Sequence, residues 1–297
     1  MKTPIPLRKG DLIALASPAR KISRDELLPA KQILEKAGFF VKMDEEVFLE
    51  DHQFAGTDEQ RASHFQQLLD DPSVKAILCV RGGYGSMRLL GKLNFNNFIK
   101  YPKWIAGYSD ITVLHAHIHQ MGIKSLHSTM PVNFATNTAE ALQSLFDALS
   151  GKSHDYETKP HALNRDGRAE GILIGGNLSI LYSLAGSADF PDLIGKILFI
   201  EDLDEYLYHI DRMMLSLKRA GAFEGLAGMV VGSLTEMKDN PVPFGKSAEE
   251  IVNEHIAEYS FPVCIGFPAG HFPDNRCLIF GQKYQLSIGK TSLLSMI

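Results

Sequence analysis

The chain has 297 residues, a formal net charge of −5, 45% apolar residues and 22% charged residues. This length accommodates one large domain or two ordinary ones, and the apolar fraction is that of a globular protein. The mild acidity provides no basic surface, which argues against nucleic acid as a partner. No apolar stretch approaches the roughly 20 residues of a membrane-spanning helix, which argues against a membrane protein.

The N-terminal sequence and the cysteines indicate the compartment. The first apolar run, residues 11–16, is short and follows a proline-rich, charged stretch, as is typical of a buried strand and not of a signal peptide. The three cysteines are widely spaced and form no CxxC pattern, which favours buried thiols over disulfides or a zinc site. They are Cys79, Cys264 and Cys277. We therefore expect a cytoplasmic protein.

Strands and helices alternate in the first half of the chain. Apolar runs predict strands at residues 11–16, 39–43, 74–80, 104–108 and 124–128. Capping boxes predict helices that begin after Ser23 and Thr57, and a further helix is expected over about 110–121. Strands separated by helices of this length predict βαβ units and a mostly parallel sheet.

A polar segment rich in turn-forming residues separates the two halves. Residues 151–167 contain almost no large apolar side chains, so we interpret them as a linker between a domain at 1–150 and a domain at 168–297. A long loop within one domain is the alternative. Repeated apolar runs predict that the second domain is rich in strands, with two helices over about 209–219 and 247–259.

Ligands of an open α/β sheet bind at the carboxyl ends of its strands, so residues that follow strands are the candidates for a site. The segment 81–86, RGGYGS, follows the predicted strand at 74–80. Three glycines in four positions let backbone N–H groups approach an anion closely. The spacing matches neither a dinucleotide-binding motif nor a P-loop. An oxyanion or carboxylate cradle and a simple tight turn both remain open.

Ser109 lies in the sequence Gly107-Tyr108-Ser109-Asp110, where a predicted strand turns into a helix. A hydroxyl at this position is exposed at the edge of the sheet, as in a nucleophile elbow, and the N–H of Asp110 could face a developing oxyanion. The second glycine of GxSxG is missing, because Ile111 occupies that position. A serine that only caps the helix is the alternative.

Candidates for an acid and a base lie in the second half. Glu201 and Asp202 end a buried strand, where a carboxylate can orient a histidine. His271 follows a strand end in a loop rich in glycine and proline, and an imidazole with an ordinary pKa near 6.5 can act as a general base. A solvated strand end and a structural histidine are the respective alternatives.

Other histidines compete with His271 for a role in the site. His127 ends a predicted strand on the same side of the sheet as Ser109 and is the second candidate. His115, His117 and His119 lie in one helix, but they form no HExxH pattern and no third ligand is evident. We therefore do not expect a metal at these three histidines.

The order of these motifs along the chain resembles that of the LD-carboxypeptidase family of serine peptidases, which includes the microcin C immunity peptidases. The resemblance begins with GDLIALASPA and GTDEQR, and it continues through VRGGYGSMRLL, GYSD, GGNL at 175–178 and FIED. It extends through HIDRMMLSLKRAGAF to IGFPAGH, so it covers nearly the whole chain. One departure is HST at 127–129, where many members have HGP.

The resemblance implies a catalytic triad of Ser109 as nucleophile, Glu201 as acid and His271 as base. It also implies an oxyanion hole formed by the backbone N–H groups of Gly83 and Asp110. Neither a metal nor another cofactor is expected. The residues expected to contact the substrate are Arg81, Gly82, Tyr84 and His127.

The same resemblance implies the fold, the substrate and the assembly. The expected fold is an N-terminal α/β sandwich with a mostly parallel sheet and a β-rich C-terminal domain, with the active site in the cleft between them. The expected substrate is a murein tetrapeptide, from which a terminal D-alanine is released during cell-wall recycling, and the expected assembly is a homodimer.

Two other functions remain open at this stage. A peptidase of the microcin-immunity type cleaves a peptidyl-nucleotide amide, and such members resemble longer chains with an extra substrate loop before the acid. The short run 186–200 leaves little room for that loop here. The other alternative is a non-catalytic protein that binds an anion on RGGYG and Asp110.

Overall fold

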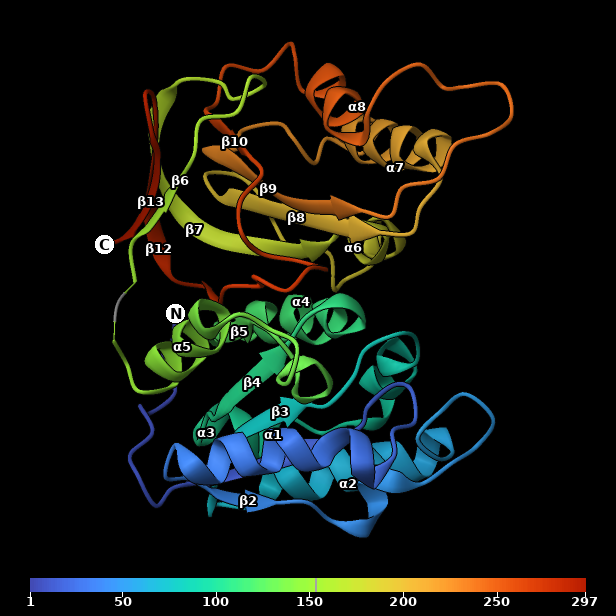
Figure 1. Cartoon of the computed structure of the whole chain (residues 1–297), viewed down its shortest axis with the longest axis vertical. Coiled ribbons are helices and arrows are strands. Elements are labelled where there is room, and N and C mark those ends of the chain that lie inside the picture. The colour runs from blue at the N-terminus through green and yellow to red at the C-terminus, as the bar shows by residue number, and fades with distance from the viewer. Residues whose placement is uncertain (153) are drawn as a thin grey trace. The chain divides into compact units, whose positions relative to one another are not determined.

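The computed structural model describes residues 1–152 and 154–297, and the chain divides into two compact units (Figure 1). One unit comprises Met1–Ser153 and Pro273–Ile279, and the other comprises His154–Phe272 and Phe280–Ile297. Residues 273–279, which the sequence assigned to the C-terminal domain, therefore belong to the first unit.

Hydrogen bonds between residues far apart in the sequence hold residues 273–279 in the first unit. The side chain of Asn137 donates a hydrogen bond to the carbonyl oxygen of Pro273 (2.8 Å), and the N–H of Cys277 donates to Ser144 Oγ (2.8 Å). The segment expected as a linker also differs, because strand β6 (Tyr156–Thr158) lies within it and pairs with a strand of the second unit. Residue 153 of that expected linker lies outside the described residues.

The first unit is built on a six-stranded sheet in the order β11-β5-β4-β3-β1-β2. The strands are β1 (Leu12–Ala16), β2 (Phe40–Lys42), β3 (Val74–Cys79), β4 (Trp104–Gly107), β5 (Ser125–His127) and β11 (Leu278–Phe280). The pairs among β1 to β5 are parallel, and each of these five strands forms where the apolar pattern predicts it.

Five α-helices accompany this sheet in the part of the chain that the structure describes. They are α1 (Arg24–Lys36), α2 (Asp58–Asp70), α3 (Asn96–Lys100), α4 (Thr112–Gln120) and α5 (Ala139–Leu149). The capping boxes at Ser23 and Thr57 are both formed, as predicted. The helices α3 and α5 were not predicted. Short 3₁₀ turns are η1 (Glu45–Phe48), η2 (Ser86–Lys92), η3 (Ser109–Ile111) and η4 (Pro131–Asn133).

The strand order places the candidate loop of the first unit at a ligand-binding position. The chain passes from β1 to β2 in one direction and then returns across β1 to β3, so the winding reverses between β1 and β3. In open parallel sheets, ligands bind beside the carboxyl ends of the strands at such a reversal. The segment RGGYGS follows β3 at this position, and the Ser109 turn follows the adjacent strand β4.

The second unit contains a seven-stranded sheet in the order β10-β9-β8-β7-β12-β13-β6. Parallel pairs join β7 (Gly167–Asn177), β8 (Ile197–Leu203), β9 (Gly228–Thr235) and β10 (Val263–Ile265). Antiparallel pairs join β7, β12 (Lys283–Ile288), β13 (Ser292–Met296) and β6. The helices α6 (Leu178–Leu184), α7 (Leu207–Arg219) and α8 (Ala248–His255) connect the parallel strands. The unit is strand-rich as predicted, but α6 is a third helix beyond the two expected, and four of its seven strands are wound as βαβ units.

A glycine lets β7 pass closely beside β8. Gly175 has φ +148°, and a Cβ atom there would lie 1.8 Å from the carbonyl oxygen of Phe199. Any side chain would therefore separate the strands that carry Asn177 and Glu201, which are paired in the register.

Among the described residues, no helix is long and apolar enough to cross a membrane.

Candidate active site

The turn that carries Ser109 has the backbone of a nucleophile elbow. Ser109 has φ +62°, a conformation that residues other than glycine rarely adopt and that often marks functional sites. It opens η3 directly after β4, and α4 begins three residues later. Neither η3 nor α4 has a side-chain cap, so the alternative of Ser109 as a simple helix cap is wrong.

Gly82 packs against the hydroxyl of Ser109. A Cβ atom at Gly82 would lie 3.0 Å from Ser109 Cβ, 3.1 Å from Ser109 Oγ and 3.4 Å from the backbone nitrogen of Asp110. The two distances to Ser109 are tighter than most real Cβ contacts, so Ser109 would have to shift by a few tenths of an ångström to admit a side chain at Gly82. The glycine-rich loop therefore borders the serine and the N–H of Asp110, which is the position expected of an oxyanion cradle.

The side chain of Asp110 fastens the two turns together. It is buried and accepts a hydrogen bond from the N–H of Ser86 (2.8 Å), the residue that ends RGGYGS. Burial raises the pKa of this carboxyl, while the bonds from Ser86 and the nearby guanidinium of Arg61 act in the opposite direction. Sequence reasoning assigned only the backbone of Asp110 to the site and missed this role of its side chain.

Arg61 supports the glycine-rich loop from α2. Its guanidinium is buried and donates to the carbonyl oxygen of Gly85 (3.1 Å) and to that of Pro18. It also forms an ion pair with Asp58. The GTDEQR motif thus contributes an arginine that braces the loop, a role that the sequence did not reveal.

Glu201 and His271 form an ion pair in the second unit. His271 Nδ1 lies 2.6 Å from Glu201 Oε2, although the residues are 70 positions apart in the sequence. The carboxylate of Glu201 is fully buried, and the side chain of His271 is 12% exposed. A short bond of this kind fixes the ring orientation and makes Nδ1 the donor, which leaves Nε2 as the atom for proton transfer.

The backbone around His271 is tied to β9. Thr235 Oγ1 donates a hydrogen bond to the carbonyl oxygen of His271 (3.1 Å), and the N–H of Ser233 donates to the carbonyl oxygen of Ala269 (2.9 Å). The β8–β9 pairing also shifts its register between Ile200 and Asp202, at the position of Glu201. Such irregularities often occur beside active sites, where they redirect a side chain.

Opposing influences act on the proton affinity of His271. Burial acts to lower the pKa of its imidazole, but the charge and hydrogen bond of Glu201 and the charge of Asp202 outweigh burial. The pKa of His271 is therefore raised above its usual value. This arrangement stabilises the imidazolium, as required of a base that holds a proton during the reaction.

Asp202 has a different task from its neighbour Glu201. Consecutive residues of a strand point to opposite faces, and Asp202 accepts hydrogen bonds from Asn177 Nδ2 (2.8 Å) and the N–H of Ser179 (2.9 Å). It thereby connects β8 to the start of α6, where Asn177 is the cap. Burial, followed by the charge of Glu201, raises the pKa of Asp202 to about 7.

The residues predicted to contact the substrate have varied surroundings. Arg81 donates to Glu26 Oε1 (3.2 Å) at the start of α1, so its charge is already paired. Tyr84 is exposed, with its ring 6.1 Å from that of Phe54. His127 is buried, and its ring centroid lies 6.0 Å from that of Tyr108.

His115, one of the three histidines of α4, is bonded to neighbouring groups of the fold. His115 is buried, with Nδ1 2.8 Å from Ser125 Oγ and Nε2 2.9 Å from the carbonyl oxygen of Gly107. Burial lowers the pKa of His115 to about 4, so the ring is neutral. Its two nitrogens instead connect α4 to the ends of β4 and β5, beside the Ser109 turn.

Comparison with known proteins decides the family. The model of the LD-carboxypeptidase N-terminal domain matches residues 11–128, and that of the C-terminal domain matches residues 170–286. The chain belongs to the LD-carboxypeptidase family. The resemblance predicted from the motifs is thereby confirmed, as is the mixed α/β fold with two sheets.

Individual relatives agree with this assignment. A probable murein peptide carboxypeptidase of Bacillus subtilis is 33% identical, over 98% of this chain and 93% of the relative. The crystal structure of muramoyltetrapeptide carboxypeptidase from Oxalobacter formigenes matches with a TM-score of 0.88 and 28% identity, over 96% of this chain and 98% of that one. The microcin C7 self-immunity protein MccF of Escherichia coli is 25% identical, over 97% of this chain and 94% of the relative.

Proposed function

We propose that this family member is a serine carboxypeptidase that releases the terminal D-alanine from murein tetrapeptides. The observation that carries the proposal is the strained Ser109 turn, with Gly82 packed against its hydroxyl. Strain at a non-glycine residue persists only where the surroundings impose it, and here it presents a hydroxyl beside backbone N–H groups. Murein peptides are the substrates named for two similar proteins.

The proposed triad consists of Ser109, His271 and Glu201. His271 Nε2 takes the proton of Ser109 Oγ as the oxygen attacks the carbonyl carbon of the scissile amide. Glu201 holds the imidazole through Nδ1 and stabilises the imidazolium that forms. The mechanism requires that His271 Nε2 come within hydrogen-bond distance of Ser109 Oγ.

The tetrahedral intermediate then collapses to an acyl-enzyme. The N–H groups of Gly83 and Asp110 bind the oxyanion, and His271 returns its proton to the departing amine of D-alanine. A water molecule, deprotonated by His271, attacks the ester and regenerates Ser109. Every step uses groups of the protein and water.

Recognition of the substrate requires a group that binds the free carboxylate of D-alanine. Arg81, Gly82, Tyr84 and His127 are our candidates for substrate contacts. Arg81 would have to exchange Glu26 for the substrate, which an arginine that is one-third exposed can do at modest cost. We further propose that the protein acts in the cytoplasm as a homodimer, as the family resemblance suggests.

A direct assay of product tests the function. The purified protein is incubated with murein tetrapeptide, and released D-alanine is measured for the wild type, Ser109→Ala and His271→Ala. We expect release by the wild type and loss in both variants. Release at an undiminished rate by Ser109→Ala would reject the nucleophile, and no release by the wild type would reject the substrate.

Cleavage of an aminoacyl-nucleotide is the second candidate function, because the chain is similar to MccF along nearly all of its length. The segment between α6 and β8, residues 185–196, is short, which favours the murein peptide. The same assay with an aminoacyl-nucleotide amide separates the two functions. Faster cleavage of the nucleotide than of the tetrapeptide would favour the second candidate.

A further inference from the structure

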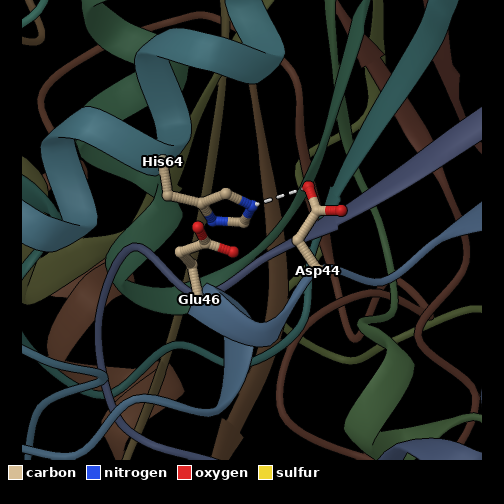
Figure 2. A group of neighbouring side chains, drawn as sticks. All are labelled: Asp44, Glu46 and His64. Carbon is tan, nitrogen blue, oxygen red and sulfur yellow. Dashed lines mark ion pairs between the residues drawn. The ribbon is translucent and has the colours of Figure 1, made fainter.

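A group of three side chains in the first unit has no part in the proposed reaction. Asp44 precedes η1, Glu46 lies within η1 and His64 lies on α2. One potential ligand atom from each residue lies within 4.8 Å of the other two (Figure 2). Within residues 1–152 and 154–297, this is the one group of three His, Cys, Asp or Glu side chains arranged in this way.

His64 provides independent evidence for a ligand at this group. Its side chain is only 4% exposed, yet Nε2 has no hydrogen-bond partner among the described residues. Figure 2 shows this nitrogen directed at the carboxylate of Asp44, with Glu46 on the neighbouring side of the ring. A buried polar atom without a hydrogen bond is costly, so the position calls for a partner.

The spacing between His64 and Asp44 fits two ligands of one ion. His64 Nε2 lies 3.4 Å from Asp44 Oδ2, whereas N–H···O bonds in proteins are about 2.7–3.2 Å long. Two ligands at about 2.1 Å from a tetrahedral zinc ion are separated by about 3.4 Å. Glu46 is exposed, so its side chain can rotate to bring the third oxygen to the same distance.

Contacts outside the group hold η1 in place. Val47 is buried, and its carbonyl oxygen accepts a hydrogen bond from Ser17 Oγ (2.8 Å). Arg24 forms an ion pair with Glu45, and its guanidinium lies 4.2 Å from the ring centroid of Phe48. The turn that supplies two carboxylates is therefore fixed without an ion, which reduces the entropy cost of binding one.

Lys42 is the charged neighbour that opposes a bound cation. Its Nζ lies 3.6 Å from Asp44 Oδ2 and 3.2 Å from Asp71 Oδ2. Asp71, the closer carboxylate, lies outside the group and can retain the lysine. An ammonium group offers no lone pair to a metal, so Lys42 lowers the affinity of the group without occupying a ligand position.

We propose that Asp44, Glu46 and His64 bind one divalent transition-metal ion such as Zn²⁺, with water completing the coordination. One imidazole nitrogen and two carboxylate oxygens suit zinc, whereas magnesium and calcium prefer oxygen ligands alone. The ion would connect η1 to α2, the helix whose Arg61 bonds to Gly85 in the glycine-rich loop. Its role is thus to stabilise this support, outside the reaction.

Zinc titration of the metal-free, full-length protein tests the proposal by calorimetry. We expect one binding event in the wild type, weakened at least about 10-fold by Asp44→Asn and by Glu46→Gln, and abolished by His64→Leu. The matched control is His52→Gln. The exposed His52 also lies near a carboxylate, with Nε2 3.7 Å from Asp51 Oδ1, but it belongs to no such group of three among the described residues. We expect this control to bind zinc as the wild type does.

Lys42→Gln gives a test in the opposite direction, because removal of the nearby positive charge should tighten zinc binding. Zinc should also raise the melting temperature of the wild type but not of the Asp44→Asn/Glu46→Gln double variant. The proposal would be overturned if the wild type bound no zinc. It would also be overturned if Asp44→Asn and Glu46→Gln bound zinc as tightly as the wild type does. These two variants preserve side-chain size at accessible positions, so they decide the test even if His64→Leu fails to fold.

Discussion

The Ser109 turn of the first unit and the Glu201–His271 pair of the second unit are positioned by different physical means. Ser109 has a backbone with a positive φ, and a methyl group at the neighbouring Gly82 would lie only 3.1 Å from its hydroxyl oxygen. His271 is held by a hydrogen bond to a buried carboxylate and by a loop attached to β9. One arrangement depends on volume and the other on charge.

This difference predicts which substitutions each arrangement tolerates. Added volume at Gly82 moves the hydroxyl of Ser109. Around His271, an isosteric change that removes the charge of Glu201 alters both the ring orientation and the proton affinity. The predictions below separate the two cases, from the largest expected effect to the smallest.

Ser109→Ala should lower kcat for D-alanine release by about 10⁶-fold, because the covalent route is lost. His271→Ala should have an effect of similar size, since the serine is inert without its base. The double variant should be no slower than either single variant, because the two residues act as one unit. Additive losses in the double variant would show that they act separately.

Glu201→Gln should lower kcat by about 10⁴-fold while the fold is retained, as measured by D-alanine release and circular dichroism. The amide cannot stabilise the imidazolium, and it no longer selects Nδ1 as the donor. Asp202→Asn is the matched control, since Asp202 bonds to Asn177 and Ser179 rather than to the histidine. An equal loss of kcat in both variants would argue against a specific role for Glu201.

Gly82→Ala should lower kcat by about 10²-fold, because a methyl group at 3.0 Å from Ser109 Cβ displaces the hydroxyl. Gly91→Ala is the matched control, because its Cβ would meet no atom within 4 Å and neither glycine has a positive φ. Steady-state kinetics of both variants measure the effect. Equal kcat values for the two would contradict the close packing of Gly82 on the serine.

The pH dependence of kcat/KM should report the raised pKa of His271. The base must be neutral, so kcat/KM should increase with pH and reach half its maximum above 6.5, the usual pKa of histidine. Glu201→Gln should move this midpoint to lower pH. A midpoint that is the same in both proteins would assign the titration to another group.

The same pKa has a smaller effect on stability. Because the pKa of His271 is higher in the folded state than in the unfolded chain, the ion pair stabilises the fold fully below about pH 6.5. This contribution is lost as the pH rises through the folded-state pKa. The free energy of unfolding of the wild type relative to His271→Gln should therefore be greatest at low pH, as measured by urea denaturation. A pH-independent difference would contradict the ion pair.

Sequence patterns identified strands and helices that are specified by residues close together in the chain. The apolar run at 74–80 predicted β3, and the capping boxes at Ser23 and Thr57 predicted the starts of α1 and α2. Hydrophobic periodicity and caps act within a few residues, so they can be seen without the fold. The strand β6 was missed because its pairing with β13, not a strong local pattern, stabilises it. The helix α5 was missed although Thr138 caps its first turn.

The sequence alone determined that the first half of the chain alternates strands and helices, that RGGYGS and Ser109 follow successive strands of a mostly parallel sheet, and that its motifs resemble those of the LD-carboxypeptidase family. Only the tertiary structure decided that residues 273–279 return to the first unit and that Asp202 bonds to Asn177 and Ser179. It also decided that Asp44, Glu46 and His64 lie together. These outcomes depend on contacts between residues far apart in the chain, whose closeness is set by strand order and packing.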